Sequence, residues 1–354
     1  MRRTRVWGAV VVAALATTSC SLVGGDDDSG DGDDSKKVVL VTHESFVMSK
    51  ELQQQFEEET GYDLVVKASG DAGALTNKLV LTKDDPLGDA VFGIDNTFGS
   101  RAIDEGILAP YAAKLPDGAQ DYALAGDTQP GGGHDLTPVD TGNVCVNVDD
   151  AWFADHGIPE PTSLDDLTKP AYQDLFVTPG ATTSSPGLAF LLATIAAYGP
   201  DGWQDYWTKL LANGAELTQG WSDAYEVDFT FSGGDRPIVL SYDSSPAFTL
   251  DGNGGTTTSA LLDTCFRQVE YAGVLAGAKN PDGAEALVDF MLSKQFQEAL
   301  PEAMYVFPVD ASAALPDDWA TFAKQPEHAF TVDPAQIAEH RDDWLEQWSD
   351  ITSR

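Results

Sequence analysis

The chain has 354 residues and a strongly acidic composition, with 20 Lys and Arg against 57 Asp and Glu and a formal net charge of −37. Its hydrophobic content of 42% is ordinary for a globular protein, so the acidity lies on the surface of a normal core, and the length suffices for two lobes. The acid excess argues against nucleic acid as a partner, because binding phosphates requires stripes of Lys and Arg.

The first residues carry the signals of an exported protein. An arginine-rich start precedes the apolar run Val6–Ala16, which is too short to span a membrane comfortably. Small residues and Cys20 follow, an arrangement that resembles the lipobox of bacterial lipoproteins. We therefore expect a lipoprotein signal peptide at residues 1–19, a lipid on Cys20 and a flexible acidic tether at residues 20–36. The expected location is the extracytoplasmic face of the cell membrane.

Strand and helix patterns alternate over residues 37–110. Apolar strands are predicted at Val38–Thr42, Tyr62–Val66 and Ala90–Ile94, with helical periodicity at Ser49–Thr60 and again after Gly73. This alternation predicts a parallel sheet covered on both faces. Polar residues follow each strand, at the end where open α/β sheets hold their ligands. They are His43 to Ser45, Asp71, and Asp95 with Asn96.

A second α/β unit follows the long strand pattern Thr141–Asp149. Its predicted elements are a strand at Asp174–Thr178 and helices at Gly187–Tyr198 and Trp203–Leu211. The first of these helices is almost wholly apolar, so we expect it inside a core. Ser184 and Ser185 precede it, and the free N–H groups of such a helix start form a seat for a phosphate or hydroxyl. A well-capped helix without a ligand explains the same residues.

The stretch Gln219–Phe248 concentrates the aromatic residues that best suit a binding site. It contains Trp221 and Tyr225 in one cluster and Tyr242, Asp243 and the two serines that follow in another. A short predicted strand at residues 237–240 would deliver the second cluster at its carboxyl end. Aromatic faces beside carboxylates and hydroxyls suit a small organic cation that also forms hydrogen bonds. Core packing explains any one of these aromatics equally well.

The last part of the chain predicts a strand followed by several helices. The patterns are a strand at Phe266–Ala272, helices at Asp282–Leu292 and Ser293–Leu300, an aromatic strand at Tyr305–Val309 and a helix at Pro334–Ile351. In the final helix, Trp344 and Trp348 share one face, where we expect them to pack.

With Cys20 lipidated, Cys145 and Cys265 remain as a pair. In an exported protein two such cysteines usually bond, so we expect a disulfide that ties together the two passages of the chain between the lobes. The sequence contains no HExxH, GxSxG, Walker or CxxC motif, and its five histidines are scattered without metal-ligand spacing. We expect a protein without catalytic activity, metal or cofactor.

Seven motifs together resemble those of a known family. They occur in the same order as in that family and cover nearly the whole exported chain. They are Thr42–Phe46, Gly93–Asn96, Ser184–Leu188, Thr218–Tyr225, Leu240–Phe248, Gln268–Glu270 and Val306–Val309. This set resembles the solute-binding proteins of ABC importers and, among them, the thiamine-binding proteins. Thr218–Tyr225 and Leu240–Phe248 are its most specific members.

The resemblance implies a two-lobed periplasmic-binding-protein-like (type II) α/β fold, each lobe a mainly parallel sheet flanked by helices, with a ligand cleft between the lobes. Residues 37–142 and 266–354 would form lobe 1, and residues 143–265 lobe 2. The implied ligand-binding residues are Asp71, Ala72, Ser184, Ser185, Trp221, Tyr242, Asp243, Ser244 and Ser245, with Tyr305 closing the site and His43 in a position that is often Tyr. Asp243 is an extra carboxylate relative to the family, which favours a cation over phosphorylated forms.

The implied function is capture of thiamine, or its phosphates, by a monomer that delivers it to the membrane permease of an ABC importer. Two alternatives stay open: a binding protein for another cation, such as a polyamine or ferric iron, and a secreted hydrolase or lyase with a cleft between its lobes.

Overall fold

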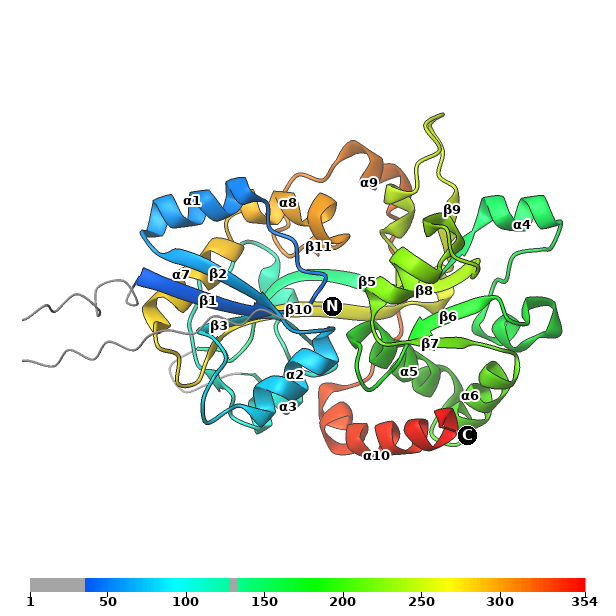
Figure 1. Cartoon of the computed structure of the whole chain (residues 1–354), viewed down its shortest axis with the longest axis horizontal. Helices are drawn as coiled ribbons and strands as arrows, with labels where there is room; N and C mark the ends of the chain where they lie inside the picture. Colours follow the sequence, from blue (N-terminus) through cyan, green and yellow to red (C-terminus); the bar gives the residue numbers. More distant parts are fainter. Residues whose placement is uncertain (1–35, 128–132, 354) are drawn as a thin grey trace, which may run out of the picture.

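The computed structural model describes residues 36–127 and 133–353. The predicted signal peptide, Cys20 and nearly all of the tether lie outside the described residues. Figure 1 shows two lobes joined by long strands. The strands are β1 Lys37–Thr42, β2 Asp63–Ala68, β3 Ala90–Asp95, β4 Leu108–Ala109, β5 Thr137–Asp149, β6 Phe176–Pro179, β7 Glu216–Thr218, β8 Ile238–Tyr242, β9 Thr258–Ala260, β10 Phe266–Leu275 and β11 Phe307–Pro308. The α-helices are α1 Lys50–Thr60, α2 Ala72–Leu81, α3 Gly99–Asp104, α4 Asp150–His156, α5 Ser185–Tyr198, α6 Trp203–Ala212, α7 Pro281–Met291, α8 Lys294–Met304, α9 Asp317–Phe322 and α10 Pro334–Thr352.

One continuous sheet runs through both lobes, in the strand order β2-β1-β3-β10-β5-β8-β6-β7. The first lobe is built on β2, β1 and β3, which pair in parallel, and the second on β8, β6 and β7, which also pair in parallel. Between them β10 and β5 pair antiparallel with each other and with their outer neighbours. This arrangement confirms the predicted two-lobed α/β fold.

Local sequence signals explain where the helices begin and end. Ser49 caps α1 by accepting a hydrogen bond from the backbone N–H of Leu52, and Gly61 ends the helix in the left-handed conformation that glycine adopts readily. In α5 the residues from Ser185 to Ile195 are all buried, as expected for an apolar helix inside a core. Within the described residues, no helix is long and apolar enough to cross a membrane.

The C-terminal helix α10 lies across both lobes (Figure 1). Trp348 of α10 packs edge-on against Trp207 of α6 in the second lobe, with ring centres 5.5 Å apart. Arg341 of the same helix lies 5.7 Å from the ring centre of Phe98, just before α3. The predicted lobe boundaries place α10 in lobe 1, and this assignment of the helix remains a proposal.

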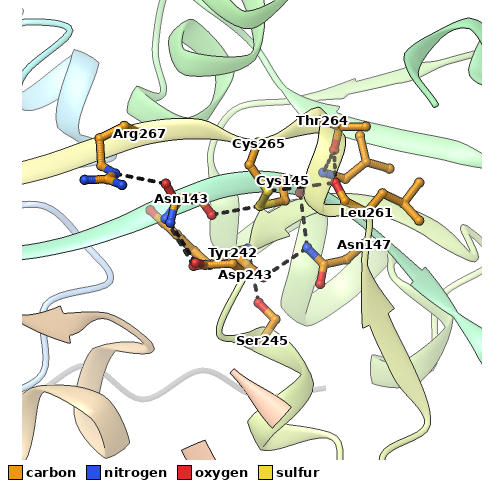
Figure 2. The surroundings of a disulfide bond; sticks show 11 residues. Asn143, Cys145, Asn147, Tyr242, Asp243, Ser245, Leu261, Thr264, Cys265 and Arg267 are labelled. Atoms are coloured by element: carbon orange, nitrogen blue, oxygen red, sulfur yellow. Dashed lines mark hydrogen bonds between the residues drawn. A yellow bond between two sulfur atoms is a disulfide. The ribbon is translucent and has the colours of Figure 1, made fainter. Parts of the chain in front are cut away.

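A disulfide links Cys145 of β5 to Cys265, directly before β10 (Figure 2). Both cysteines are fully buried. Beside the disulfide, Asn147 donates from Nδ2 to the carbonyl of Tyr242, and the backbone N–H of Val146 donates to Thr264 Oγ1. The bond therefore fastens the two central strands to each other where they enter the second lobe.

One predicted strand is shorter than expected. The pattern Tyr305–Val309 forms only the two-residue strand β11, because its first residue is the left-handed C-cap of α8, which extends beyond its predicted end at Leu300 to Met304. Tyr305 then ends the helix with a φ of 63°. This left-handed turn changes the chain direction and sends the Tyr305 ring toward the space between the lobes, where it meets Trp221.

Candidate functional site

A cavity of about 160 Å³ lies between the two lobes. The first lobe contributes residues that follow β1 and β2, the second contributes the start of α5, the loop after β7 and the end of β8, and β10 and the end of α8 supply the rest. The lining residues are His43, Glu44, Ser45, Val47, Asp71, Ala72, Ser185, Pro186, Trp221, Ser222, Glu226, Tyr242, Gln268, Glu270, Ala303, Met304, Tyr305 and Val306.

Three aromatic rings form one wall of the cavity. The ring centre of Trp221 lies 6.2 Å from that of Tyr242 and 5.8 Å from that of Tyr305. Trp221 is held in place from behind, since Tyr225 stacks on it at 5.0 Å and its Nε1 donates to Ser241 Oγ at 3.0 Å. The aromatic wall is therefore positioned by packing before any ligand arrives.

Asp71 connects the two lobes through backbone hydrogen bonds. Its Oδ1 accepts from the N–H of Ala72 at 2.6 Å and of Ser185 at 3.1 Å, while Oδ2 accepts from the N–H of Trp221 at 3.0 Å. Ala72 begins α2 in the first lobe, whereas Ser185 and Trp221 belong to the second. Burial raises the pKa of Asp71, and these hydrogen bonds oppose that rise by stabilising the carboxylate.

A pair of buried carboxyl groups lies on the central strands behind the cavity. Glu270 of β10 is the register partner of Asp140 of β5. Burial raises the pKa of both groups well above the ordinary range, and their mutual contact lowers the pKa of Asp140 while raising that of Glu270. Burial therefore disfavours two charges on this pair, and the Glu270 carboxyl also lines the cavity.

His43 contributes a neutral imidazole rather than a cation. Burial lowers the pKa of His43 to about 4, so the ring is uncharged at neutral pH. Its Nε2 lies 3.4 Å from Glu270 Oε1. Because His43 is neutral, this contact does not offset the negative charge of the site.

Two glutamates and a pair of serines lie at the mouth. Ser45 Oγ of the first lobe and Ser222 Oγ of the second are hydrogen-bonded at 3.1 Å. Burial raises the pKa of Glu44, and the neighbouring charges of Asp71, Asp223 and Glu226 add to the rise. Among the described residues that line the cavity there is no Lys or Arg. Aromatic faces and carboxylates without a basic residue suit an organic cation.

The structure separates the predicted site residues into two groups. Those that line the cavity are His43, Asp71, Ala72, Ser185, Trp221, Tyr242 and Tyr305. Those that lie outside its lining are Ser184, Asp243, Ser244 and Ser245. Ser184 is fully buried as the N-cap of α5 and accepts from the N–H of Gly187.

The three residues after Tyr242 lie away from the cavity because β8 ends at Tyr242 and the chain turns into a short 3₁₀ helix. Asp243 accepts from the N–H and the Nδ2 of Asn143, at 3.1 and 2.7 Å (Figure 2). Ser244 donates to the carbonyl of Tyr305, and Ser245 Oγ is bonded to Ser241 Oγ at 2.8 Å. Their hydrogen bonds support Tyr305 and the aromatic wall from behind.

Six polar lining residues were missing from the predicted site: Glu44, Ser45, Ser222, Glu226, Gln268 and Glu270. Gln268 donates from Nε2 to Ser185 Oγ at 2.9 Å, which joins β10 to the start of α5. Gln268 and Glu270 are two positions apart on β10, so the sequence indicated that they share one face of the strand but not that this face meets the cavity. Within the described residues, no group of three or more His, Cys, Asp or Glu is arranged to hold a metal ion.

Comparison with known proteins identifies the family to which the chain belongs. Residues 85–324 match the family model described as bacterial extracellular solute-binding protein. Two similar relatives are the thiamine-binding periplasmic proteins of Salmonella typhimurium, 29% identical over 86% of this chain and 88% of the relative, and of Brucella melitensis, 29% identical over 89% and 92%.

Solved structures show the same architecture. A periplasmic thiamin binding protein superposes with a TM-score of 0.77 at 28% identity, covering 90% of this chain and 96% of that one. Iron-bound HitA from Pseudomonas aeruginosa shares the fold at a TM-score of 0.65 and 19% identity, over 89% and 99% of the two chains. The chain therefore belongs to the family of bacterial extracellular solute-binding proteins and is a binding protein rather than an enzyme.

Proposed function

We propose that this protein captures thiamine between its lobes and delivers it to the membrane permease of an ABC importer. The observation that carries the proposal is a cavity whose lining, within the part of the chain that the structure describes, combines three aromatic rings with four carboxyl groups and no Lys or Arg. Thiamine has a permanently charged thiazolium, which the aromatic rings of the lining can bind, and an aminopyrimidine, which can donate hydrogen bonds to its carboxylates. The names of the relatives, thiamine-binding periplasmic proteins, support the same ligand.

Each part of the lining has a distinct role in this proposal. Trp221, Tyr242 and Tyr305 would present their faces to the rings of the ligand, and a desolvated cation–π contact contributes about 2 kcal/mol. Asp71 and Glu44 would provide negative charge beside them. Ser185 and Ala72 would contact the ligand through their positions at the helix starts, whereas Ser184, Asp243, Ser244 and Ser245 would act by holding the lining residues in place.

Contacts between the lobes support a mechanism of closure by hinge motion about β5 and β10. The N–H of Ala74 in α2 donates to the carbonyl of Thr183 before α5 at 3.0 Å, beside the hydrogen bonds of Asp71. Release to the permease requires these contacts to open.

In the proposal a lipid on Cys20 and the tether at residues 20–36 keep the monomer near the membrane. Detergent partitioning of a Cys20→Ser variant, which cannot carry the lipid, tests this anchor.

Titration calorimetry with thiamine tests the proposal directly. We expect one thiamine per chain and a rise in melting temperature, since ligand at one hundred times its Kd stabilises the folded state by about 2.7 kcal/mol. Putrescine and ferric citrate serve as competitors for the alternative ligands. Absence of heat and of thermal stabilisation with thiamine and both of its phosphates would refute the proposal.

A further inference from the structure

Three polar side chains form a hydrogen-bonded row across the two strands that connect the lobes (Figure 2). Arg267 of β10 donates from Nε to Asn143 Oδ1 at 3.0 Å, and these two residues are register partners in the sheet. Asn143 of β5 donates to both carboxylate oxygens of Asp243, from Nδ2 at 2.7 Å and from its N–H at 3.1 Å. The carbonyl of Asn143 accepts from the N–H of Asp243 at 2.9 Å. We call Arg267, Asn143 and Asp243 the Asn143 row.

The Asn143 row lies outside the cavity lining, but both chain neighbours of Asp243 are connected to the aromatic wall. Tyr242, directly before Asp243, lines the cavity, and its ring lies against β5, since a Cβ placed on Gly142 would be 3.2 Å from Tyr242 Cδ1. Ser244, directly after Asp243, donates to the carbonyl of Tyr305. The positions of two of the three rings in the wall therefore depend on where Asp243 is held.

Removing a member of the row leaves a polar group without its partner in the interior. Asn143 and Asp243 are both buried. Burial raises the pKa of Asp243 to about 6, and the hydrogen bonds from Asn143 and the charge of Arg267 oppose that rise by stabilising the carboxylate. Because a buried carboxylate or amide without a partner costs free energy, the three side chains hold one another in a single arrangement.

The row is also connected to the first lobe. Asn96, directly after β3, donates from Nδ2 to the carbonyl of Arg267 at 3.1 Å, and its Oδ1 accepts from the N–H of Val269 at 2.9 Å. These two bonds hold β10 on either side of Gln268, which lines the cavity. A path of hydrogen bonds therefore runs from the end of β3 in the first lobe to Asp243, beside the aromatic wall.

We propose that Asn143 and Arg267 are positioning residues for the ligand, which act through Asp243 on the aromatic wall, an inference that rests on the proposed function. A ring attracts a cation that lies over its face. A shift of Tyr242 or Tyr305 within the wall therefore weakens binding even in a protein that remains folded. Since the row lies on β5 and β10, it links the strands about which the lobes would move to the surface that contacts the ligand.

Thiamine affinity and unfolding free energy, measured together on Asn143→Ala, test this inference. By titration calorimetry at a temperature where the variant is folded, we expect affinity to fall at least about tenfold. Thr194→Val is the matched control, because it removes a buried hydrogen bond from Trp207 Nε1 in the core of the second lobe. It should lower stability and leave affinity unchanged. Unchanged affinity in folded Asn143→Ala overturns the inference and leaves the proposed function standing, whereas failure of the parent to bind thiamine overturns the proposed function as well.

Exchanging the two central side chains tests the pairing itself, also if the alanine variant folds poorly. Asn143→Asp alone places two carboxylates face to face, and Asp243→Asn alone places two amides face to face. The double variant again pairs a carboxylate with an amide and sets the carboxylate beside Arg267. We expect each single variant to bind thiamine more weakly and the double variant to bind within about threefold of the parent. A double variant that binds no better than the weaker single variant contradicts the positioning role.

Arg267→Met tests the outer member of the row, because it keeps a long side chain and removes both the donor and the charge. We expect thiamine affinity about threefold below that of the parent. This loss is smaller than in Asn143→Ala, since the bonds between Asn143 and Asp243 remain. Unchanged affinity in this variant removes Arg267 from the positioning role.

Discussion

At the scale of single residues, Asp71 and Asp243 show how hydrogen bonding decides the role of a buried carboxylate. Asp71 accepts from backbone groups of both lobes and still lines the cavity. Asp243 has both oxygens bonded to Asn143, and it is 1% exposed. Both residues follow predicted strands, so the difference arises from the partners that the fold brings to them and not from their position in the sequence pattern.

Trp221 is the residue whose loss should affect binding most clearly. Replacing it with alanine in Trp221→Ala removes one cation–π face, worth about 2 kcal/mol, so we expect thiamine affinity to fall about thirtyfold by calorimetry. The same change leaves a void beside Tyr225 and should destabilise the protein by about 3–5 kcal/mol.

Two further variants keep this test interpretable if the alanine variant folds poorly. Trp221→Phe retains an aromatic face and loses the hydrogen bond to Ser241, so we expect a smaller loss of affinity. Trp344→Phe alters a tryptophan on α10 that lies outside the cavity lining and should bind like the parent. Unchanged thiamine affinity in a folded Trp221→Ala protein would remove Trp221 from the site.

At the scale of elements, the features that depend on neighbours in sequence could be predicted. The strands β1, β3 and β5 and the helices α1, α5 and α10 follow from periodicity and caps such as Ser49. Glu270 could not be placed in the cavity, because its position depends on pairing with Asp140, which is far away in the chain. The turn at Tyr305 was missed for a related reason, since packing carries α8 past its sequence pattern despite Pro301.

The disulfide between β5 and the start of β10 should contribute a large share of the stability. Cys145 and Cys265 are 120 residues apart, and closing a loop of that size stabilises the folded state by about 3–5 kcal/mol on the chain-entropy model. We expect a Cys145→Ser, Cys265→Ser double variant to unfold at a correspondingly lower urea concentration than the oxidised parent.

Two measurements control this comparison. Alkylation under denaturing, non-reducing conditions should find neither cysteine reactive in the parent, and two reactive thiols would contradict the bond. Adding a reductant should lower the urea midpoint of the parent and leave that of the double variant unchanged, because only the parent has a disulfide to lose.

At the scale of the whole molecule, the carboxyl groups on the surface and those in the interior both favour the binding of a cation. The full chain has a formal net charge of −37, and most of the described Asp and Glu residues are not buried. The interior holds Asp71, Asp95, Asp140 and Glu270, and burial raises the pKa of each of them. A cation bound between the lobes reduces the repulsion among these carboxylates, so ligand binding and stability are linked through charge.

This linkage predicts that the ligand-free protein gains stability when the pH is lowered from 7.5 to about 5.5. Burial raises the pKa of Asp243 from 3.8 to about 6, so the folded state binds its proton more tightly than the unfolded state does. Stability from this group is therefore greatest below about pH 4 and declines as the pH rises to about 6, by a total of about 3 kcal/mol. Asp71, Asp95, Asp140 and Glu270, whose pKa values burial also raises, act with the same sign. About 1 kcal/mol of the Asp243 total is gained between pH 7.5 and 5.5, and urea unfolding at these two pH values measures it.

Asp243→Asn provides the matched test, because it removes the ionisable group while keeping a side chain of the same size. We expect a shallower dependence of unfolding free energy on pH in this variant, and the same dependence as in the parent in Asp84→Asn, which alters an exposed carboxylate.

Thiamine affinity should change with pH in the opposite direction from the stability of the ligand-free protein, and so should fall as the pH is lowered. The raised pKa values of Glu44 and Asp71 mean that acidification neutralises them at a higher pH than ordinary carboxylates, which weakens the attraction for the cation. Maximal ligand-free stability at pH 7.5 would contradict this account of the buried carboxyl groups.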